Sequence, residues 1–388
     1  MTFTRHAVLI SSITLLLTGC VSSVEGPQYQ ASEQLPPYLQ SNFQSYIQDS
    51  RQWLLQHRVF LTGDKSTELA AVAPYELIPK QPNGQGILLV HGLGDSPFSY
   101  SDIAADLVSQ GYRVRVILLP GHGTRAADLS LVQLKDWQEV VQHHYQLLNN
   151  KVDGVWLGGY STGANLVTSL AYEHPSIKGL LLFSPAFKPK NPLAALSPMA
   201  SYFVNWESKK KEDNYTRYNS LHMNGAATYY KSAQAVQHDL ASHHYDKPTF
   251  VMLSEADETI DAAFARDTFS QTFTNPNNQL LWFGESRYPD PRIHTFSMNL
   301  PQQHIHSASH VSLIFSPDNP VYKRDGKIRM CFNEQPKGQD CATAAADKVW
   351  FSAYGDGDEK HIRARMTWNP YFEQNMQQLN AFLKKNRH

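Results

Sequence analysis

The sequence of 388 residues predicts an α/β fold with a doubly wound, mostly parallel β-sheet and helices on both faces. Three observations predict it. Short runs of consecutive apolar residues, typical of strands buried on both faces, recur along the chain. Helix-like segments separate these runs, so we expect parallel strands joined by right-handed crossovers. One run, residues 155–157, leads through Gly159-Tyr160-Ser161-Thr162-Gly163 into a helix-like segment, and this strand–turn–helix context makes a Gly-x-Ser-x-Gly motif informative.

The elements can be assigned in order along the chain. We expect one helix within 38–60 and an early antiparallel strand within 70–77. The buried strands are expected at 87–90, 114–118, 155–157, 179–183, 248–253 and 280–283, with a further strand at 294–298. Helices are expected at 100–110, around 137–141, from 164 onward, at 262–273 and at 371–383, where apolar residues share one face.

Composition excludes some classes of protein. The formal net charge is −1 at pH 7 and no long run of like charges occurs, which argues against a nucleic-acid-binding face. Hydrophobic residues make up 41% of the chain, as in folded rather than disordered proteins. The length suits one large domain with insertions or two smaller domains.

The N-terminus predicts export. An apolar run over residues 7–17 is too short to span a bilayer as a stable anchor, and it ends in Leu17-Thr18-Gly19-Cys20. This ending resembles the lipobox of bacterial lipoproteins, which implies a signal peptide at 1–19, acylation of Cys20 and a location in the outer membrane, facing the periplasm or the cell surface. An ordinary secretory signal is the alternative. Residues 20–37 are expected to form a tether to a folded domain at 38–388.

Two further cysteines, Cys331 and Cys341, are expected to form a disulfide in an exported protein. The alternative is a pair of reduced thiols. A loop this short would be stabilised by about 3 kcal/mol on the chain-entropy model. Nothing in the sequence places this pair near Ser161, so we expect it to affect activity only through stability.

Four motifs in a fixed order carry a resemblance to a known superfamily. They are Leu88-Leu89-Val90-His91-Gly92, Leu119-Pro120-Gly121-His122-Gly123-Thr124, Asp136-Trp137 and the Gly-x-Ser-x-Gly motif. Together they resemble the α/β-hydrolase superfamily, most closely the group of monoacylglycerol lipases, carboxylesterases and serine aminopeptidases. The resemblance implies an α/β-hydrolase fold with a cap inserted over the catalytic serine.

The expected cap spans about 188–246, where the alternation of strands and helices lapses. Its aromatic residues suit the lining of an apolar acyl pocket, although each of them could equally pack on the core: Trp206, Tyr215, Tyr218, Tyr229 and Tyr230. A C-terminal extension at about 318–388 is longer than the family core requires. Its middle part suggests no role.

A catalytic triad of Ser161, Asp257 and His310 is expected. A serine hydroxyl needs a base within hydrogen-bonding reach, and the base needs a carboxylate to fix its tautomer. In this fold the triad follows the order Ser, acid, His, and the three residues occur in that order. The rival acids are Glu255, Glu258 and Asp261.

The base also has rivals, His304 and His306, which lie in an alternating stretch that suits the end of a strand. Closely spaced histidines can also bind zinc or copper, but no Cys or carboxylate cluster accompanies these, and we expect no metal.

The oxyanion hole is expected, by resemblance, to consist of the backbone N–H groups of Leu93 and Thr162. His91 is expected to orient the loop that carries Leu93 rather than to act as a second base.

The sequence thus predicts an exported, lipid-anchored serine hydrolase that cleaves carboxylic esters, of lipids or of short acyl groups, through an acyl-enzyme on Ser161. No cofactor is implied, and no oligomeric state is predicted. Cleavage of peptides or thioesters is the alternative within the enzyme class. A non-catalytic lipoprotein that uses the fold as a binding module is the alternative outside it.

Overall fold

The computed structural model describes residues 25–387. The expected signal peptide, Cys20 and the start of the tether lie outside the described residues and stay predictions. Within the described part of the chain, no helix combines the length and apolar character that crossing a membrane requires.

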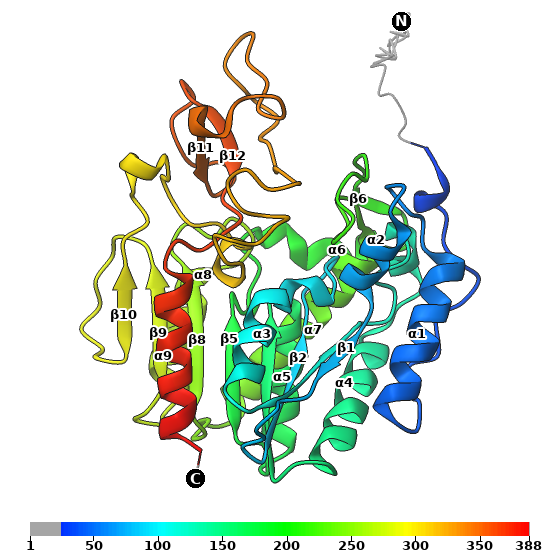
Figure 1. Cartoon of the computed structure of the whole chain (residues 1–388), viewed down its shortest axis with the longest axis vertical. Coiled ribbons are helices and arrows are strands. Elements are labelled where there is room, and N and C mark those ends of the chain that lie inside the picture. The colour runs from blue at the N-terminus through cyan, green and yellow to red at the C-terminus, as the bar shows by residue number, and fades with distance from the viewer. Residues whose placement is uncertain (1–24, 388) are drawn as a thin grey trace, which may run out of the picture.

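An eight-stranded sheet forms the centre of the molecule (Figure 1). Its strands, in spatial order, are β1 (Tyr75–Leu77), β3 (Arg113–Ile117), β2 (Gln85–Val90), β4 (Gly154–Tyr160), β5 (Gly179–Phe183), β8 (Thr249–Ser254), β9 (Gln279–Phe283) and β10 (Ile293–Phe296). Strand β1 is antiparallel to β3, and every other neighbouring pair in this sheet is parallel. The predicted doubly wound α/β fold is therefore confirmed.

Strand β2 shows why the central strands are apolar throughout. Ile87 and Leu89 belong to one hydrophobic core and Leu88 and Val90 to another, because successive side chains point to opposite faces of a sheet. The first core includes helices α2 (Lys65–Val72), α3 (Ser101–Ser109) and α9 (Phe372–Lys385); the second includes α1 (Phe43–His57), α4 (Leu134–Asn149), α5 (Thr162–Glu173) and α8 (Ala262–Thr272). Each buried Leu or Ile side chain contributes about 1.5–3 kcal/mol, so both faces stabilise the fold.

One predicted strand is largely wrong. Residues 65–72 form α2, and only β1 remains of the strand expected within 70–77. Asp64 explains the difference, because its side chain caps the helix by accepting a hydrogen bond from the Thr67 backbone at 3.0 Å. The helix-forming residues that follow, including two alanines, continue the turn that this cap begins.

The segment between β5 and β8 contains α6 (Ser197–Ala200), the antiparallel pair β6 (Trp206–Ser208) and β7 (Leu221–His222), and α7 (Met223–Ser242). We call residues 188–246 the cap. Helix α7 packs against the nucleophile helix α5, where Asn165 donates a hydrogen bond to Ser232 at 3.1 Å. The start of the described chain lies against the cap, since the Tyr29 hydroxyl donates to the Lys210 carbonyl at 2.6 Å.

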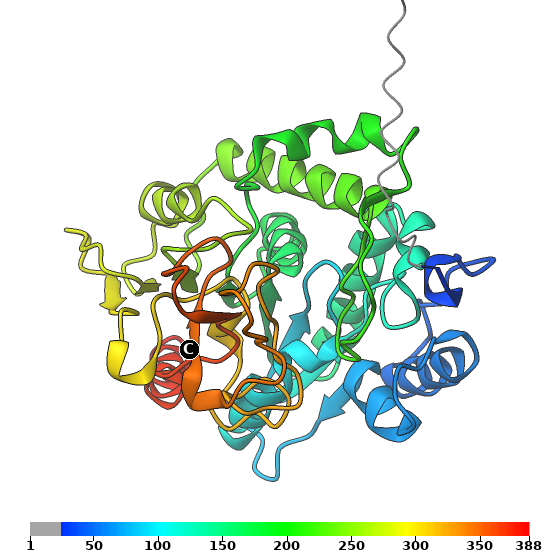
Figure 2. The same ribbon diagram turned by 90° about the horizontal axis from the view of Figure 1, so that it is seen from above.

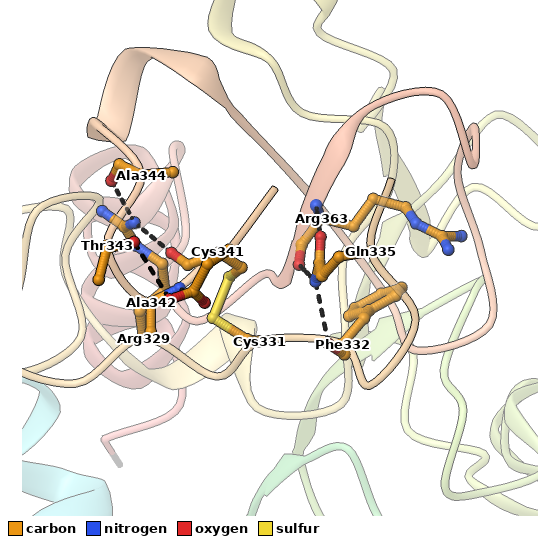
Figure 3. Close-up of a disulfide and its surroundings, with 10 residues drawn as sticks. Arg329, Cys331, Phe332, Gln335, Cys341, Ala342, Thr343, Ala344 and Arg363 are labelled. Atoms are coloured by element: carbon orange, nitrogen blue, oxygen red, sulfur yellow. Dashed lines mark hydrogen bonds between the residues drawn. A yellow bond between two sulfur atoms is a disulfide. The ribbon is translucent and has the colours of Figure 1, made fainter. Parts of the chain in front are cut away.

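The part of the C-terminal extension before α9 forms a small unit above the same end of the sheet as the β6–β7 pair (Figures 1 and 2). It contains the parallel pair β11 (Val349–Ser352) and β12 (Ile362–Arg365). The predicted disulfide between Cys331 and Cys341 is present in it (Figure 3). Arg329 donates hydrogen bonds at 2.7 Å to the carbonyls of Cys341 and Ala344, which holds the closed loop against its neighbours.

Short 3₁₀ helices complete the described chain: η1 (Pro27–Tyr29), η2 (Pro97–Tyr100), η3 (Ala126–Ser130), η4 (Pro192–Leu196), η5 (Pro301–Gln303), η6 (Ser312–Ile314) and η7 (Ala346–Lys348).

Candidate active site

Ser161 lies in a sharp turn between β4 and α5. Its backbone adopts φ 55° and ψ −118°, a conformation that non-glycine residues rarely take and that is typical of strained positions in functional sites. The flanking glycines make the turn possible. A Cβ on Gly159 would lie 2.4 Å from the Ala164 Cα, and one on Gly163 would lie 2.0 Å from the Val90 carbonyl oxygen.

Asp257, His310 and Ser161 form one line of hydrogen bonds. The His310 Nε2 lies 2.9 Å from the Ser161 Oγ, and the His310 Nδ1 lies 2.7 Å from the Asp257 Oδ2. All three residues are buried, with 8% of Ser161 exposed. This arrangement lets the imidazole accept the serine proton while the carboxylate holds the Nδ1 proton.

Asp257 is itself held in place. Its Oδ1 accepts hydrogen bonds from the backbone of Thr259 at 2.8 Å and of Ile260 at 2.9 Å, which leaves Oδ2 for His310. The rival acids have other partners. Glu255 accepts hydrogen bonds from the backbone of Glu285 and Ser286, whereas Asp261 caps α8 through Phe264.

Glu258 also lies close to His310, but not at its ring. Its Oε2 accepts a hydrogen bond from the His310 backbone N–H at 3.2 Å, and its Oε1 forms an ion pair with Arg365 of β12. On the other side, the Ser184 hydroxyl donates to the His310 carbonyl at 3.0 Å. Sequence reasoning missed the positioning role of Ser184 and Arg365. The position of Ser184 directly after β5, at the sheet edge shared with Ser161, was the available signal.

The rival histidines point elsewhere. His304 stacks on Trp350 with ring centroids 4.9 Å apart, and His306 lies 3.3 Å from the Asp356 carboxylate. The expected strand end is only an isolated bridge at Ile305, because His304 adopts a left-handed conformation with φ 52° that interrupts an extended chain. Within residues 25–387, no three His, Cys, Asp or Glu side chains gather as a metal site would require.

The two expected oxyanion donors, Leu93 and Thr162, both line the pocket at Ser161. Neither backbone N–H donates a hydrogen bond to another residue that the structure describes, so both are free for a ligand.

Two buried histidines hold the loop that carries Leu93. The His91 Nε2 accepts a hydrogen bond from the Leu119 backbone at 3.0 Å, and the His122 Nε2 accepts one from Gly94 at 3.0 Å. Burial lowers the pKa of His91 well below its usual value and that of His122 to about 4, so both rings are neutral at pH 7 and their Nε2 atoms can accept. His122 is a further positioning residue that sequence reasoning had noted only as part of a motif.

A pocket of about 270 Å³ opens on Ser161. The cap contributes Tyr218 and Tyr229 to its lining, whereas the other three aromatic residues singled out in the sequence do not line it. The C-terminal extension, whose middle part suggested no role in the sequence, contributes Tyr354 and Arg365. The reason is topological, since β12 lies above the strand ends that carry the triad.

Comparisons with known proteins agree with this geometry. A family model described as serine aminopeptidase, S33, matches residues 81–216. The thermostable monoacylglycerol lipase of Bacillus sp. (strain H-257) is 34% identical over 101 residues, which are 26% of this chain and 40% of that protein. The match therefore spans well under half of that relative's length.

Two solved structures are similar to part of this chain. A structure of the metagenome-derived lipolytic enzymes LipS and LipT has a TM-score of 0.49 and 19% identity, over 57% of this chain and 91% of its own. The monoacylglycerol lipase of Paleococcus ferrophilus has a TM-score of 0.44 and 17% identity, over 58% and 89%. The chain thus has a doubly wound sheet with a nucleophile-type turn, and its residues 81–216 match the serine aminopeptidase, S33, family model.

Proposed function

We propose that this protein is a serine hydrolase that cleaves carboxylic esters through an acyl-enzyme on Ser161. The observation that carries the proposal is the continuous hydrogen-bond line from Asp257 through His310 to Ser161, which ends in a pocket with two free backbone donors.

The chemistry follows from these distances. The Ser161 Oγ attacks the ester carbonyl carbon while His310 Nε2 takes the hydroxyl proton. The carbonyl oxygen becomes an oxyanion, which the N–H groups of Leu93 and Thr162 stabilise by ~3 kcal/mol each. The intermediate collapses, the alcohol leaves with the proton from His310, and the acyl group stays on Ser161. Water then attacks the acyl-enzyme with His310 as base, which releases the carboxylic acid and restores the serine.

The substrate is an acyl ester. The matched relative is a monoacylglycerol lipase, and tyrosines and Leu221 in the pocket suit an acyl chain. The name of the family model makes peptide cleavage the second candidate, with thioesters the third. Comparing kcat/KM for 4-nitrophenyl butanoate with that for an amino-acid 4-nitroanilide separates the first two candidates.

Export and lipidation at Cys20 remain part of the proposal, with the outer membrane as the location. The cap supports a lipid surface as the partner. Six of its residues are exposed apolar side chains within 193–204: Leu193, Leu196, Met199, Tyr202, Phe203 and Val204. Lys209, Lys210 and Lys211 follow them and suit anionic headgroups. We call 193–204 the apolar cap segment.

The start of the described chain lies beside this surface. Tyr29 packs edge-on against Trp206 with ring centroids 5.6 Å apart, so a lipid attached nine residues earlier would hold the cap close to the bilayer. Fatty-acid labelling of wild type and Cys20→Ala tests the anchor, and equal labelling of both would refute it.

A fluorophosphonate probe tests the catalytic proposal. The wild-type protein should be labelled and should hydrolyse 4-nitrophenyl butanoate, whereas Ser161→Ala should do neither. Ser41→Ala, a change of an exposed serine, is the matched control and should behave as wild type. An unlabelled, inactive wild-type protein would favour the binding module.

A further inference from the structure

Two arginines line the pocket that opens on Ser161. Arg217 lies in the cap between β6 and β7, and Arg365 lies at the end of β12 in the C-terminal extension. A pocket for a neutral acyl chain and a neutral alcohol gains nothing from cations, because a charge withdrawn from water costs free energy unless it is paired. The pairing of each guanidinium therefore indicates what else the pocket binds.

Arg365 is paired within the protein. It forms an ion pair with Glu258, and its guanidinium lies 4.9 Å from the centre of the Tyr354 ring. Arg217 differs. Among residues 25–387, its guanidinium has no hydrogen-bond partner and no ion pair within 4.0 Å. Burial opposes the charge on Arg217, and the charge of Asp95, which lines the same pocket, favours it.

None of the described acids near the pocket forms an ion pair with Arg217 within 4.0 Å. Asp95 is buried and burial raises its pKa, with Arg217 lowering it in part. Glu258 is occupied by Arg365, and Asp257 by His310. Among the described residues that line this pocket, Arg217 is thus a cation with no carboxylate within 4.0 Å, although the charge of Asp95 acts on it.

Arg217 is held rigidly by the backbone on either side of it. The carbonyl of Thr216 accepts a hydrogen bond from the Ser96 hydroxyl at 2.6 Å, and the N–H of Tyr218 donates to the Gly94 carbonyl at 2.7 Å. Gly94 follows Leu93, the expected oxyanion donor, so the cap arginine is tied to the oxyanion loop. The anchored backbone fixes the position from which the Arg217 side chain extends into the pocket.

The charges of Arg217 and Arg365 act on the same two tyrosines of the pocket. Burial raises the pKa of both Tyr160 and Tyr354, and Arg217 and Arg365 each lower both values in part. Tyr160 directly precedes Ser161, and both tyrosines line the pocket. An anion that enters beside Ser161 therefore meets both arginines.

We propose that the pocket selects esters that carry an anionic group, a carboxylate or a phosphate, with Arg217 as its principal contact and Arg365 as a second one. This inference rests on the proposed esterase function. Guanidinium groups bind both anions through two parallel N–H···O bonds. A charge-assisted bond of this kind corresponds to about a 10- to 100-fold change in affinity.

Two matched pairs of substrates test the proposal and distinguish the sources of the anion. Mono-4-nitrophenyl succinate against 4-nitrophenyl butanoate places a carboxylate on the acyl side. 1-Butanoylglycerol 3-phosphate against 1-butanoylglycerol places a phosphate on the alcohol side. We expect the charged member of at least one pair to have a kcat/KM about 10- to 100-fold higher, mainly through KM.

Arg217→Gln should lower kcat/KM for the charged esters about 10- to 100-fold more than for their neutral partners, whereas Arg217→Lys should retain part of the preference. Arg51→Gln, which removes an exposed arginine of α1, is the control for net charge. The proposal is wrong if neither pair shows a preference in wild type. It is also wrong if Arg217→Gln lowers turnover of charged and neutral esters equally, since that indicates a purely structural role.

A binding measurement keeps this test separate from the proposed activity. Succinate and glycerol 3-phosphate are titrated into Ser161→Ala by calorimetry, and binding of at least one should weaken about 10- to 100-fold when Arg217→Gln is added. If no ester is cleaved and Ser161 is not labelled, the proposed function fails, yet this titration still decides on the anion site. Absence of any binding refutes the site.

Discussion

The choice between His310 and His306 as catalytic base gives the sharpest test of the site. His310 lies 2.9 Å from Ser161 and 2.7 Å from Asp257, so His310→Ala removes the base and leaves the serine without a proton acceptor. Loss of a triad member costs on the order of 10⁴ or more in kcat, which corresponds to about 5.5 kcal/mol of transition-state stabilisation.

His306 offers a matched comparison four residues earlier. Its ring is 46% exposed and faces Asp356, and a surface pair of this kind is worth about 0–1 kcal/mol in stability. His306→Ala should therefore leave kcat on 4-nitrophenyl butanoate within about threefold of wild type, as should His304→Ala. A surface substitution usually changes the free energy by about 0.5 kcal/mol or less, whereas a tenfold change in rate requires about 1.4 kcal/mol. An inactive His306→Ala beside a near-normal His310→Ala would refute this reading of the site.

Three further predictions follow from other parts of the molecule. His122 alone should lower the free energy of unfolding by about 3 kcal/mol as the pH falls from 6.5 to 4. Its pKa is lowered from 6.5 to about 4 in the folded protein, so only the unfolded chain takes up a proton in that range. Free energies from urea unfolding should therefore depend less steeply on pH for His122→Gln than for wild type, and an equal pH dependence would contradict this prediction. Replacing Tyr202 and Phe203, each 83% exposed, by serine should weaken binding to vesicles that contain anionic lipid but spare turnover of a soluble ester. Leu55→Ser, at an exposed apolar residue of α1, should leave both vesicle binding and turnover unchanged. Equal vesicle binding by wild type and both variants would rule out the apolar cap segment as a membrane surface. Cys331→Ser combined with Cys341→Ser should lower the free energy of unfolding by about 3 kcal/mol. The double variant should also have a lower kcat/KM at temperatures where calorimetry shows it to be folded. Full activity at those temperatures would mean that the disulfide acts through stability alone.

Most of the fold could be predicted from the sequence because the buried strands are recognisable as continuous apolar runs. Strands such as Gly179–Phe183 are covered on both faces, and only a continuous apolar run satisfies that environment. The short strand β1 was harder to predict. It lies at the sheet edge with all three residues half-buried, and a side-chain cap decided where the preceding helix began.

The site divides in the same way between local and long-range information. The nucleophile turn at Ser161 could be predicted from local geometry, because a Cβ on either flanking glycine would clash with nearby backbone atoms. Arg217 and Arg365 could not be found like this. They lie 56 and 204 residues from Ser161 in sequence, and only the packing of cap and extension on one end of the sheet brings them into its pocket.

The disulfide shows how the extension acquires a fixed position at this end. A pair of strands as short as β11 and β12 is only marginally stable on its own, so the unit needs other constraints. Cys331 supplies one such constraint, because its backbone forms an isolated antiparallel β-bridge with Ala364 of β12. The carbonyl of the neighbouring Met330 accepts a hydrogen bond from the Arg365 backbone N–H at 2.7 Å. Met330, which directly precedes the disulfide-closed loop, is thus hydrogen-bonded to the residue that pairs with Glu258. Glu258 in turn holds the backbone of His310, so a covalent link in the extension bears on the position of the catalytic base through three consecutive contacts.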